Sequence, residues 1–176
     1  MNSQPFIAIL TVSDSAAAGE AEDRSGPLLR DLVRTLWPEQ EPVMGLVADE
    51  RDRIASRLRQ WADGQDVALI LTSGGTGFTP RDVTPEATRD VIEKEAPGLA
   101  EAMRAAGLRV TPHAMLSRAV AGIRGRTLII NLSGSPKAVR EQFEVLKPVL
   151  PHALEQLRAG KDGVRYARAG EHRRQA

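Results

Sequence analysis

An apolar run that opens into a glycine-rich loop is the feature that most constrains the fold of this chain. Residues 67–71 are all apolar, which is typical of a strand buried on both faces. Residues 74–77 (Gly-Gly-Thr-Gly) follow, and their glycines permit positive φ and a close approach of the backbone to a ligand. Thr84 and Pro85 then predict a helix start, with Thr84 as the N-cap. A strand, a glycine turn and a helix start form the layout in which α/β proteins bind phosphate groups.

The common phosphate-binding motifs do not fit this loop. A Walker loop ends in Gly-Lys-Ser/Thr, whereas Gly77 precedes Phe78. A dinucleotide fingerprint counted from Gly75 requires glycine where Pro80 stands. A tight surface turn is the plain alternative for the glycines, but Asp82 favours a phosphate site because a carboxylate beside a phosphate loop suits a metal-bridged nucleotide.

Strand and helix patterns alternate along the rest of the chain. Prolines and glycines mark the ends of these segments, with Pro148 and Pro151 expected to break the last helical region. Strands are expected at residues 6–12, 42–48, 67–71, 119–123 and 127–131, and helices from residue 26, after residue 49, at 85–95 and 99–106, and from residue 136. The alternation predicts an α/β fold with a mainly parallel sheet covered on both faces.

Length and composition indicate one domain without a polyelectrolyte partner. The chain has 176 residues, and we expect a single domain over residues 1–160 followed by a loose basic tail, residues 161–176. Its net charge is only +1, which argues against nucleic acid as a partner. The absence of cysteine excludes disulfides, thiolate metal sites and a cysteine nucleophile, and fits a reducing compartment. With no membrane-length apolar run and no secretion signal, we expect a cytoplasmic protein that does not enter a membrane.

Several polar segments are expected to meet at one edge of the sheet. In an open parallel sheet, the loops after the strands' carboxyl ends share an edge, where ligands bind. This rule brings together residues 13–14, Asp49, residues 74–82 and a second strand–glycine–helix junction at residues 133–137. At that junction Ser135 is placed to cap a helix, so the free N–H groups there offer a second anion site.

Two phosphate cradles beside carboxylates indicate two anionic substrates held together by a divalent cation. Asp49 and Asp82 are the candidate Mg²⁺ ligands, although helix capping is the alternative for each aspartate alone. The chain has no Gly-x-Ser-x-Gly elbow, and His113, His152 and His172 lack metal-ligand spacing. Phosphoryl or nucleotidyl transfer fits this set, since positioning and charge neutralisation supply most of its catalysis.

The segment at residues 72–88 resembles the signature of the molybdopterin adenylyltransferases. Its sequence is Thr-Ser-Gly-Gly-Thr-Gly-Phe-Thr-Pro-Arg-Asp-Val-Thr-Pro-Glu-Ala-Thr. The resemblance extends to other segments, namely residues 13–14 with Gly19 and residues 115–118, 121–125, 128–132 and 134–137. The resemblance implies a three-layer α/β/α fold of the molybdopterin-binding-domain type, with a mainly parallel mixed sheet, and a homotrimer. It also implies Mg²⁺-dependent transfer of AMP from ATP to the terminal phosphate of molybdopterin, with release of pyrophosphate. The adenylylated product would pass to a molybdate-insertion protein.

The resemblance also suggests roles for individual residues. Asp49 and Asp82 match acidic residues implicated in Mg²⁺ binding and catalysis. The residues expected to bind nucleotide and pterin are Ser73, Gly74, Gly75, Thr76, Gly77, Ser117, Gly134, Ser135 and Lys137. Arg81 is a further candidate for contact with the triphosphate. Ser133 and Ala48 stand where the family commonly has proline, and we expect looser backbone at both positions.

Three alternatives remain open at this point. The chain could be a non-catalytic molybdopterin-binding paralogue or carrier, which would keep the glycine loop. It could serve the molybdate-insertion step, although such proteins carry this fold as one domain of a much longer chain. A nucleotide-binding regulator is the third alternative, and it would bind nucleotide without pterin. The presence of both Asp49 and Asp82 favours the enzyme.

Overall fold

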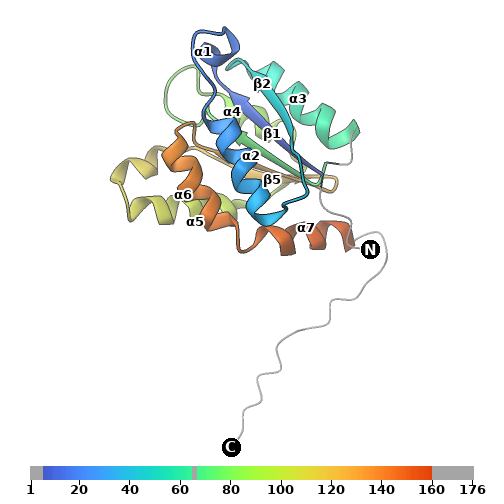
Figure 1. Cartoon of the computed structure of the whole chain (residues 1–176). Helices are drawn as coiled ribbons and strands as arrows, with labels where there is room; N and C mark the ends of the chain where they lie inside the picture. The colour runs from blue at the N-terminus through green and yellow to red at the C-terminus, as the bar shows by residue number, and fades with distance from the viewer. Residues whose placement is uncertain (1–5, 65–66, 160–176) are drawn as a thin grey trace, which may run out of the picture.

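A mixed sheet forms the middle layer of the computed structural model, which describes residues 6–64 and 67–159 (Figure 1). Within these residues, six strands are arranged in the order β2-β1-β3-β6-β5-β4. The first four strands of that order are parallel, and the last two are antiparallel to their neighbours. The strands are β1 (Ile7–Val12), β2 (Val43–Val47), β3 (Leu69–Ser73), β4 (Lys94–Glu95), β5 (Ala121–Arg124) and β6 (Thr127–Leu132). The predicted mainly parallel mixed sheet is confirmed, and the tail predicted for residues 161–176 lies outside the described residues.

Helices cover both faces of the sheet and give the three predicted layers. Side chains alternate along β1, so that Ile7 and Ile9 pack on one face while Ala8 and Leu10 pack on the other. The first face is covered by α2 (Ser25–Leu36), α5 (Pro97–Leu108), α6 (Pro136–Leu146) and α7 (Leu150–Ala159), which lie in front of the sheet in Figure 1. The second face is covered by α3 (Arg51–Gly64) and α4 (Thr84–Arg89). No helix in the described part of the chain combines the length and apolarity needed to cross a membrane.

Two of the predicted helices have different bounds in the structure. The prediction of a helix over residues 85–95 is wrong beyond Arg89, where α4 ends, because residues 94–95 join the sheet as β4. Glu93 N–H donates to the carbonyl of Ile123, and Ala96 N–H donates to that of Ala121. These bonds to β5 override the local helical pattern. The next helix begins at Pro97, two residues before the prediction, since proline is well suited to the first helical turn.

Helix starts and breaks at other positions follow the sequence closely. The hydroxyl of Ser135 accepts a hydrogen bond from Ala138 N–H at 3.2 Å, which confirms its capping role for α6. The break expected near Pro148 and Pro151 falls between α6 and α7. The capping role predicted for Thr84 is wrong, because Val83 occupies the cap position and Thr84 is the first residue of α4.

Candidate active site

The two glycine junctions predicted separately form one structure at the carboxyl ends of β3 and β6. Gly74 N–H donates to the carbonyl of Leu132 at 3.1 Å. The hydroxyl of Ser73 donates to the carbonyl of Ser133 at 3.0 Å. A Cβ atom on Gly134 would lie 3.3 Å from the Cα of Gly74. The two loops therefore touch through their backbones.

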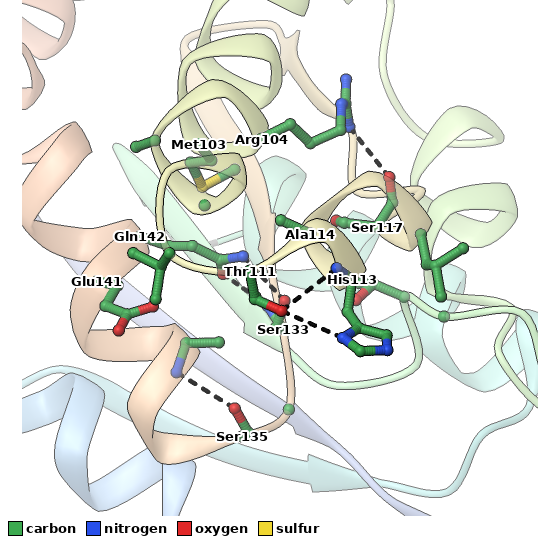
Figure 2. A pocket seen from close by; sticks show the side chains of 18 of the residues that line it. Met103, Arg104, Thr111, His113, Ala114, Ser117, Ser133, Ser135, Glu141 and Gln142 are labelled. Atoms are coloured by element: carbon green, nitrogen blue, oxygen red, sulfur yellow. Dashed lines mark hydrogen bonds between the residues drawn. The ribbon is translucent and has the colours of Figure 1, made fainter.

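A pocket lies on each side of this contact. The larger one, about 620 Å³, lies between α5, α6 and the short helical turn η1 (Pro112–Leu116), as Figure 2 shows. Met103, Val110 and Leu116 contribute apolar surface to it. The smaller pocket, about 380 Å³, is lined mainly by polar residues after β1 together with Asp49. Gly75, Asp82 and Gly134 line both pockets, so ligands in the two pockets would meet at these residues.

Asp49 is held by reciprocal hydrogen bonds with the loop after β1. Asp14 N–H donates to Asp49 Oδ2 at 2.8 Å, and Asp49 N–H donates to Asp14 Oδ1 at 3.0 Å. The carboxylate of Asp49 therefore binds this loop instead of capping α3, which begins at Arg51. Burial raises the pKa of Asp49, and the charges of Asp14 and Asp82 raise it further against the opposing hydrogen bond from Asp14 N–H.

Arg81 is paired with Asp14 across the front of the site. Its Nε and Nη2 atoms donate to the two carboxylate oxygens of Asp14 at 2.8 and 2.7 Å. This bidentate pair lowers the pKa of Asp14. The sequence suggested Arg81 as a contact for phosphate, and in this structure its guanidinium joins the glycine loop to the loop after β1.

Asp82 closes a turn at the end of the glycine loop. Its Oδ2 accepts from Thr79 N–H at 2.7 Å, and its own N–H donates to the Thr79 carbonyl at 3.0 Å. A Cβ atom on Gly77 would lie 3.1 Å from Oδ2, so the carboxylate lies over that glycine. The turn fixes Asp82 at the junction of the two pockets.

The carboxylates of Asp49 and Asp82 form a donor set that suits a hard cation. Both line the smaller pocket. The described residues contain no group of three or more His, Cys, Asp or Glu side chains able to hold a metal by themselves. Magnesium commonly takes one or two carboxylates and completes its shell with water and phosphate oxygens. The two carboxylates match the number that such an ion usually takes from a protein.

Most residues predicted to bind substrate line these pockets. Ser73 and Gly74 line the smaller pocket, Gly75 and Gly134 line both, and the remaining pocket residues of the prediction line the larger one, namely Thr76, Gly77, Ser117 and Ser135. Lys137 lines neither pocket. Its exposed side chain lies 4.0 Å from Glu141 on α6, and its role in binding stays a prediction.

Comparison with known proteins agrees with this arrangement. The family described as a probable molybdopterin binding domain matches residues 8–152. This chain belongs to that family. The molybdopterin adenylyltransferase of Helicobacter pylori is 43% identical over 150 residues, which cover 85% of this chain and 85% of that protein. A crystal structure of MoaB from Thermus thermophilus, described as a molybdopterin biosynthesis enzyme, has a TM-score of 0.82 and 52% identity, and the match covers 88% of this chain and 96% of that chain.

The same domain also occurs in longer relatives. The molybdenum cofactor synthesis protein cinnamon of Drosophila melanogaster is 46% identical over 146 residues. That match covers 83% of this chain and 24% of cinnamon, so this chain spans about a quarter of the length of that relative.

In this molybdopterin-binding domain, Arg118 holds the glycine loop in place, a role the sequence did not reveal. Its Nε donates to the carbonyl of Gly77 at 2.7 Å, and its Nη2 donates to that of Asp82 at 2.6 Å. Its Nη1 is paired with the carboxylate of Glu86 in the first turn of α4, and its backbone N–H donates to the carbonyl of Thr76. The guanidinium therefore connects the glycine loop to α4. The only signal for this role in the sequence was the place of Arg118 within the segments that resemble the family.

The pKa of Glu86 reflects its pairing with Arg118. Partial burial acts to raise the pKa of Glu86, but the hydrogen bond from Arg118, a backbone hydrogen bond and the charges of Arg118 and Arg89 outweigh it. The net effect lowers the pKa of Glu86, as expected for a carboxylate paired with a guanidinium.

We expect Arg118→Ala to reduce both stability and catalysis. The variant loses two bonds to loop carbonyls and the closer of the two cations beside Glu86, so the free energy of unfolding should fall by about 1–3 kcal/mol. Because Asp82 is part of the released loop, kcat should fall about tenfold or more when measured well below the melting temperature. Urea unfolding and steady-state kinetics measure the two effects.

Arg124→Ala is the matched control for this prediction. Arg124 also pairs with a carboxylate, that of Asp63, and donates to a carbonyl, that of Val91, but it lines neither pocket. Its removal should lower stability and leave kcat unchanged. Equal kcat values for the two variants would show that Arg118 contributes to stability alone.

The loops where proline is missing are held by hydrogen bonds. Ser133 N–H donates to Gln142 Oε1 at 2.9 Å, and Gln142 Nε2 donates to the Ser133 hydroxyl at 2.9 Å, a contact visible in Figure 2. Beside Ala48, the carboxylate and N–H of Asp49 are both bound to Asp14. Gln142 and Asp14 thus restrain the turns for which the sequence suggested looser backbone.

His113 lies in the larger pocket, although nothing in the sequence placed it among the site residues. It lies on η1, and a dashed line in Figure 2 joins it to Thr111. Its Nδ1 is 3.1 Å from the hydroxyl oxygen of Thr111. The imidazole thereby adds a polar group to a wall that is otherwise mostly apolar.

Proposed function

We propose that this chain is a molybdopterin adenylyltransferase, which transfers AMP from ATP to the terminal phosphate of molybdopterin and releases pyrophosphate during molybdenum cofactor biosynthesis. The observation that carries the proposal is the meeting of two pockets at Gly75, Asp82 and Gly134. A transfer between two bound molecules requires such a junction, since each must keep its own site while their reacting groups touch. The adenylyltransferase relative of similar length supports the choice of reaction.

The reaction needs little from side chains besides positioning and charge. An oxygen of the molybdopterin phosphate attacks the α-phosphorus of ATP, and the bond from that phosphorus to the β-phosphate oxygen breaks. The attacking phosphate is already ionised at neutral pH, so no protein base has to remove a proton. The role of the glycine loop is to present backbone N–H groups to the phosphates at the junction, as glycine-rich nests do in other phosphate sites.

Magnesium is part of this proposal, with Asp49 and Asp82 as its protein ligands. When bound, the ion would offset the negative charge that develops on the departing pyrophosphate. The two carboxylates lie on the same pocket as Gly74 and Gly75, which is where a triphosphate would need both amide donors and a cation. Ser117 and Ser135 would contact the pterin substrate from the larger pocket.

The assembly, location and partner are proposals of the same kind. We propose a cytoplasmic homotrimer whose product passes to a molybdate-insertion protein. Exposed apolar side chains in and beside the larger pocket offer surface for contacts between subunits, namely Leu108, Val110, Met115 and Leu116. The occurrence of this domain within a longer molybdenum cofactor synthesis protein is consistent with direct hand-over of product.

An end-point assay tests the proposed reaction. Purified protein is incubated with molybdopterin, ATP and Mg²⁺, and adenylylated pterin and pyrophosphate are quantified. We expect both products in equal amounts and their loss when EDTA removes the metal. Tight pterin binding without product would identify a carrier or silent paralogue, and nucleotide binding without pterin binding would identify a regulator.

A further inference from the structure

Thr84 carries a hydroxyl group whose position the fold itself does not explain. The side chain is fully buried, and Oγ1 is one of two buried side-chain polar atoms without a hydrogen-bond partner in the described part of the chain. It does not cap α4, since the cap position belongs to Val83. A buried hydroxyl without a partner is unfavourable, whereas valine fills nearly the same volume without this penalty. Such an atom in a folded protein requires an explanation.

The Thr84 hydroxyl oxygen and a carboxylate oxygen of Asp49 lie beside the same glycine, Gly75. A Cβ atom on Gly75 would lie 2.3 Å from Thr84 Oγ1 and 2.8 Å from Asp49 Oδ1. Both oxygens thus lie against one side of Gly75. Thr84 is fixed there because its N–H donates to the Gly75 carbonyl at 3.0 Å.

Asp49 has one oxygen bound and one available at this point. Its Oδ2 accepts the hydrogen bond from Asp14 N–H. Its Oδ1 accepts no hydrogen bond from any residue that the structure describes. Among the described residues, the Thr84 hydroxyl thus has no acceptor and Asp49 Oδ1 has no donor, and both atoms lie beside Gly75.

We propose that Thr84 is a positioning residue for Asp49. When cation and nucleotide are bound, the hydroxyl of Thr84 donates a hydrogen bond to Asp49 Oδ1, directly or through one water molecule. The inference rests on the proposed role of Asp49 as a metal ligand. Ligating carboxylates are usually oriented by hydrogen bonds from groups that do not touch the metal. This hydrogen bond also gives a second reason for glycine at position 75, besides its positive φ of 64°. A Cβ atom there would lie close to both Thr84 Oγ1 and Asp49 Oδ1.

Three threonine variants separate this role from a structural one. Thr84→Val removes the hydroxyl at constant shape, and Thr84→Ser keeps it. Thr127→Val is the matched control, because Thr127 is also buried but donates to the Val67 carbonyl at 2.6 Å and lines neither pocket. We expect Thr84→Val to have an equal or higher melting temperature with about 10–100-fold lower kcat. Thr127→Val should show the opposite result, a lower melting temperature with unchanged kcat, and Thr84→Ser should keep most of the parent's activity.

Metal binding provides a readout that does not depend on turnover. The affinity for Mn²⁺, measured by electron paramagnetic resonance in the presence of ATP, should fall about 10–100-fold in Thr84→Val. In an Asp49→Asn background, adding Thr84→Val should change this affinity no further, because the two groups act as one unit. Parental kcat and Mn²⁺ affinity in Thr84→Val would overturn the inference, as would independent effects in the double variant.

The same measurements distinguish failure of this inference from failure of the proposed function. If Asp49→Asn binds Mn²⁺ as tightly as the parent, the metal role of Asp49 is wrong, and the proposal for Thr84 fails with it. If Asp49→Asn loses binding while Thr84→Val keeps it, only the role of Thr84 is wrong.

Discussion

Asp82→Asn is expected to reduce AMP transfer at least about a hundredfold, the usual effect of removing one preorganised electrostatic contact. The substitution keeps the size of the side chain, and the amide oxygen can still accept the hydrogen bond from Thr79 N–H. The turn that places residue 82 at the junction of the pockets is therefore preserved. What disappears is one negative charge, and with it a metal ligand beside the phosphates.

Stability should not follow activity in this variant. The charges of Asp14 and Asp82 both raise the pKa of Asp49, which means that Asp82 repels a partly buried carboxylate in the folded state. Removing that charge should leave the melting temperature equal or higher. Steady-state kinetics and thermal unfolding of the same preparation measure both effects.

Asp63→Asn is the control for the loss of a carboxylate. Asp63 pairs with Arg124, which lowers its pKa, and it lines neither pocket. This variant should lose a little stability and keep its full rate of transfer. Asp82→Asn with parental kcat would contradict the metal and catalytic role of Asp82.

The layers of the fold were predictable because local patterns carry them. The apolar run at residues 67–71 overlaps the buried strand β3, which begins two residues later at Leu69. Pro148 lies between α6 and α7, and Pro151 lies in the first turn of α7. Residues 94–95 show where local patterns fail. Their place in the sheet depends on backbone bonds between Glu93, Ala96 and β5, and no pattern within the segment records those partners.

The edge of the sheet that carries the candidate site was also predictable. Asp49 and the glycine loop follow strands whose carboxyl ends lie at the same edge, so topology brought them together without any knowledge of side-chain contacts. Arg118 could not be found in this way. Its guanidinium donates to backbone carbonyls 36 and 41 residues away in sequence. Because every residue has a backbone carbonyl, the residue types do not reveal which carbonyls accept these bonds.

Thr84 illustrates a different limit of sequence reasoning. A threonine before proline and glutamate has the pattern of a helix cap, and the chain does begin a helix there. Tertiary packing decides the position of this side chain, since Thr84 is fully buried and its hydroxyl lies beside Gly75, on the side where Asp49 Oδ1 also lies. A side-chain hydroxyl thus serves as a local cap at Ser135, whereas at Thr84 it is buried without a hydrogen-bond partner among the described residues.

Gly74→Ala is expected to have the largest effect on stability, lowering the free energy of unfolding by about 3 kcal/mol or more. Gly74 has a φ of 103°, a conformation that side chains with a Cβ rarely adopt. The new Cβ would lie 2.1 Å from the carbonyl oxygen of Val12, and this backbone atom cannot move without shifting the end of β1. Either the strand or the loop must give way, and urea unfolding measures the result.

The same substitution should disable the site even in the fraction that remains folded. Gly74 N–H binds the carbonyl of Leu132, and its Cα lies against Gly134, so a displaced Gly74 separates the two glycine junctions. Gly98→Ala is the matched control, because it has negative φ at an exposed helical position with nothing within 4 Å of the new Cβ. It should be neutral or more stable by up to about 1 kcal/mol, with full activity. A Gly74→Ala protein as stable and active as Gly98→Ala would mean that the contact between the two loops is not required for the site.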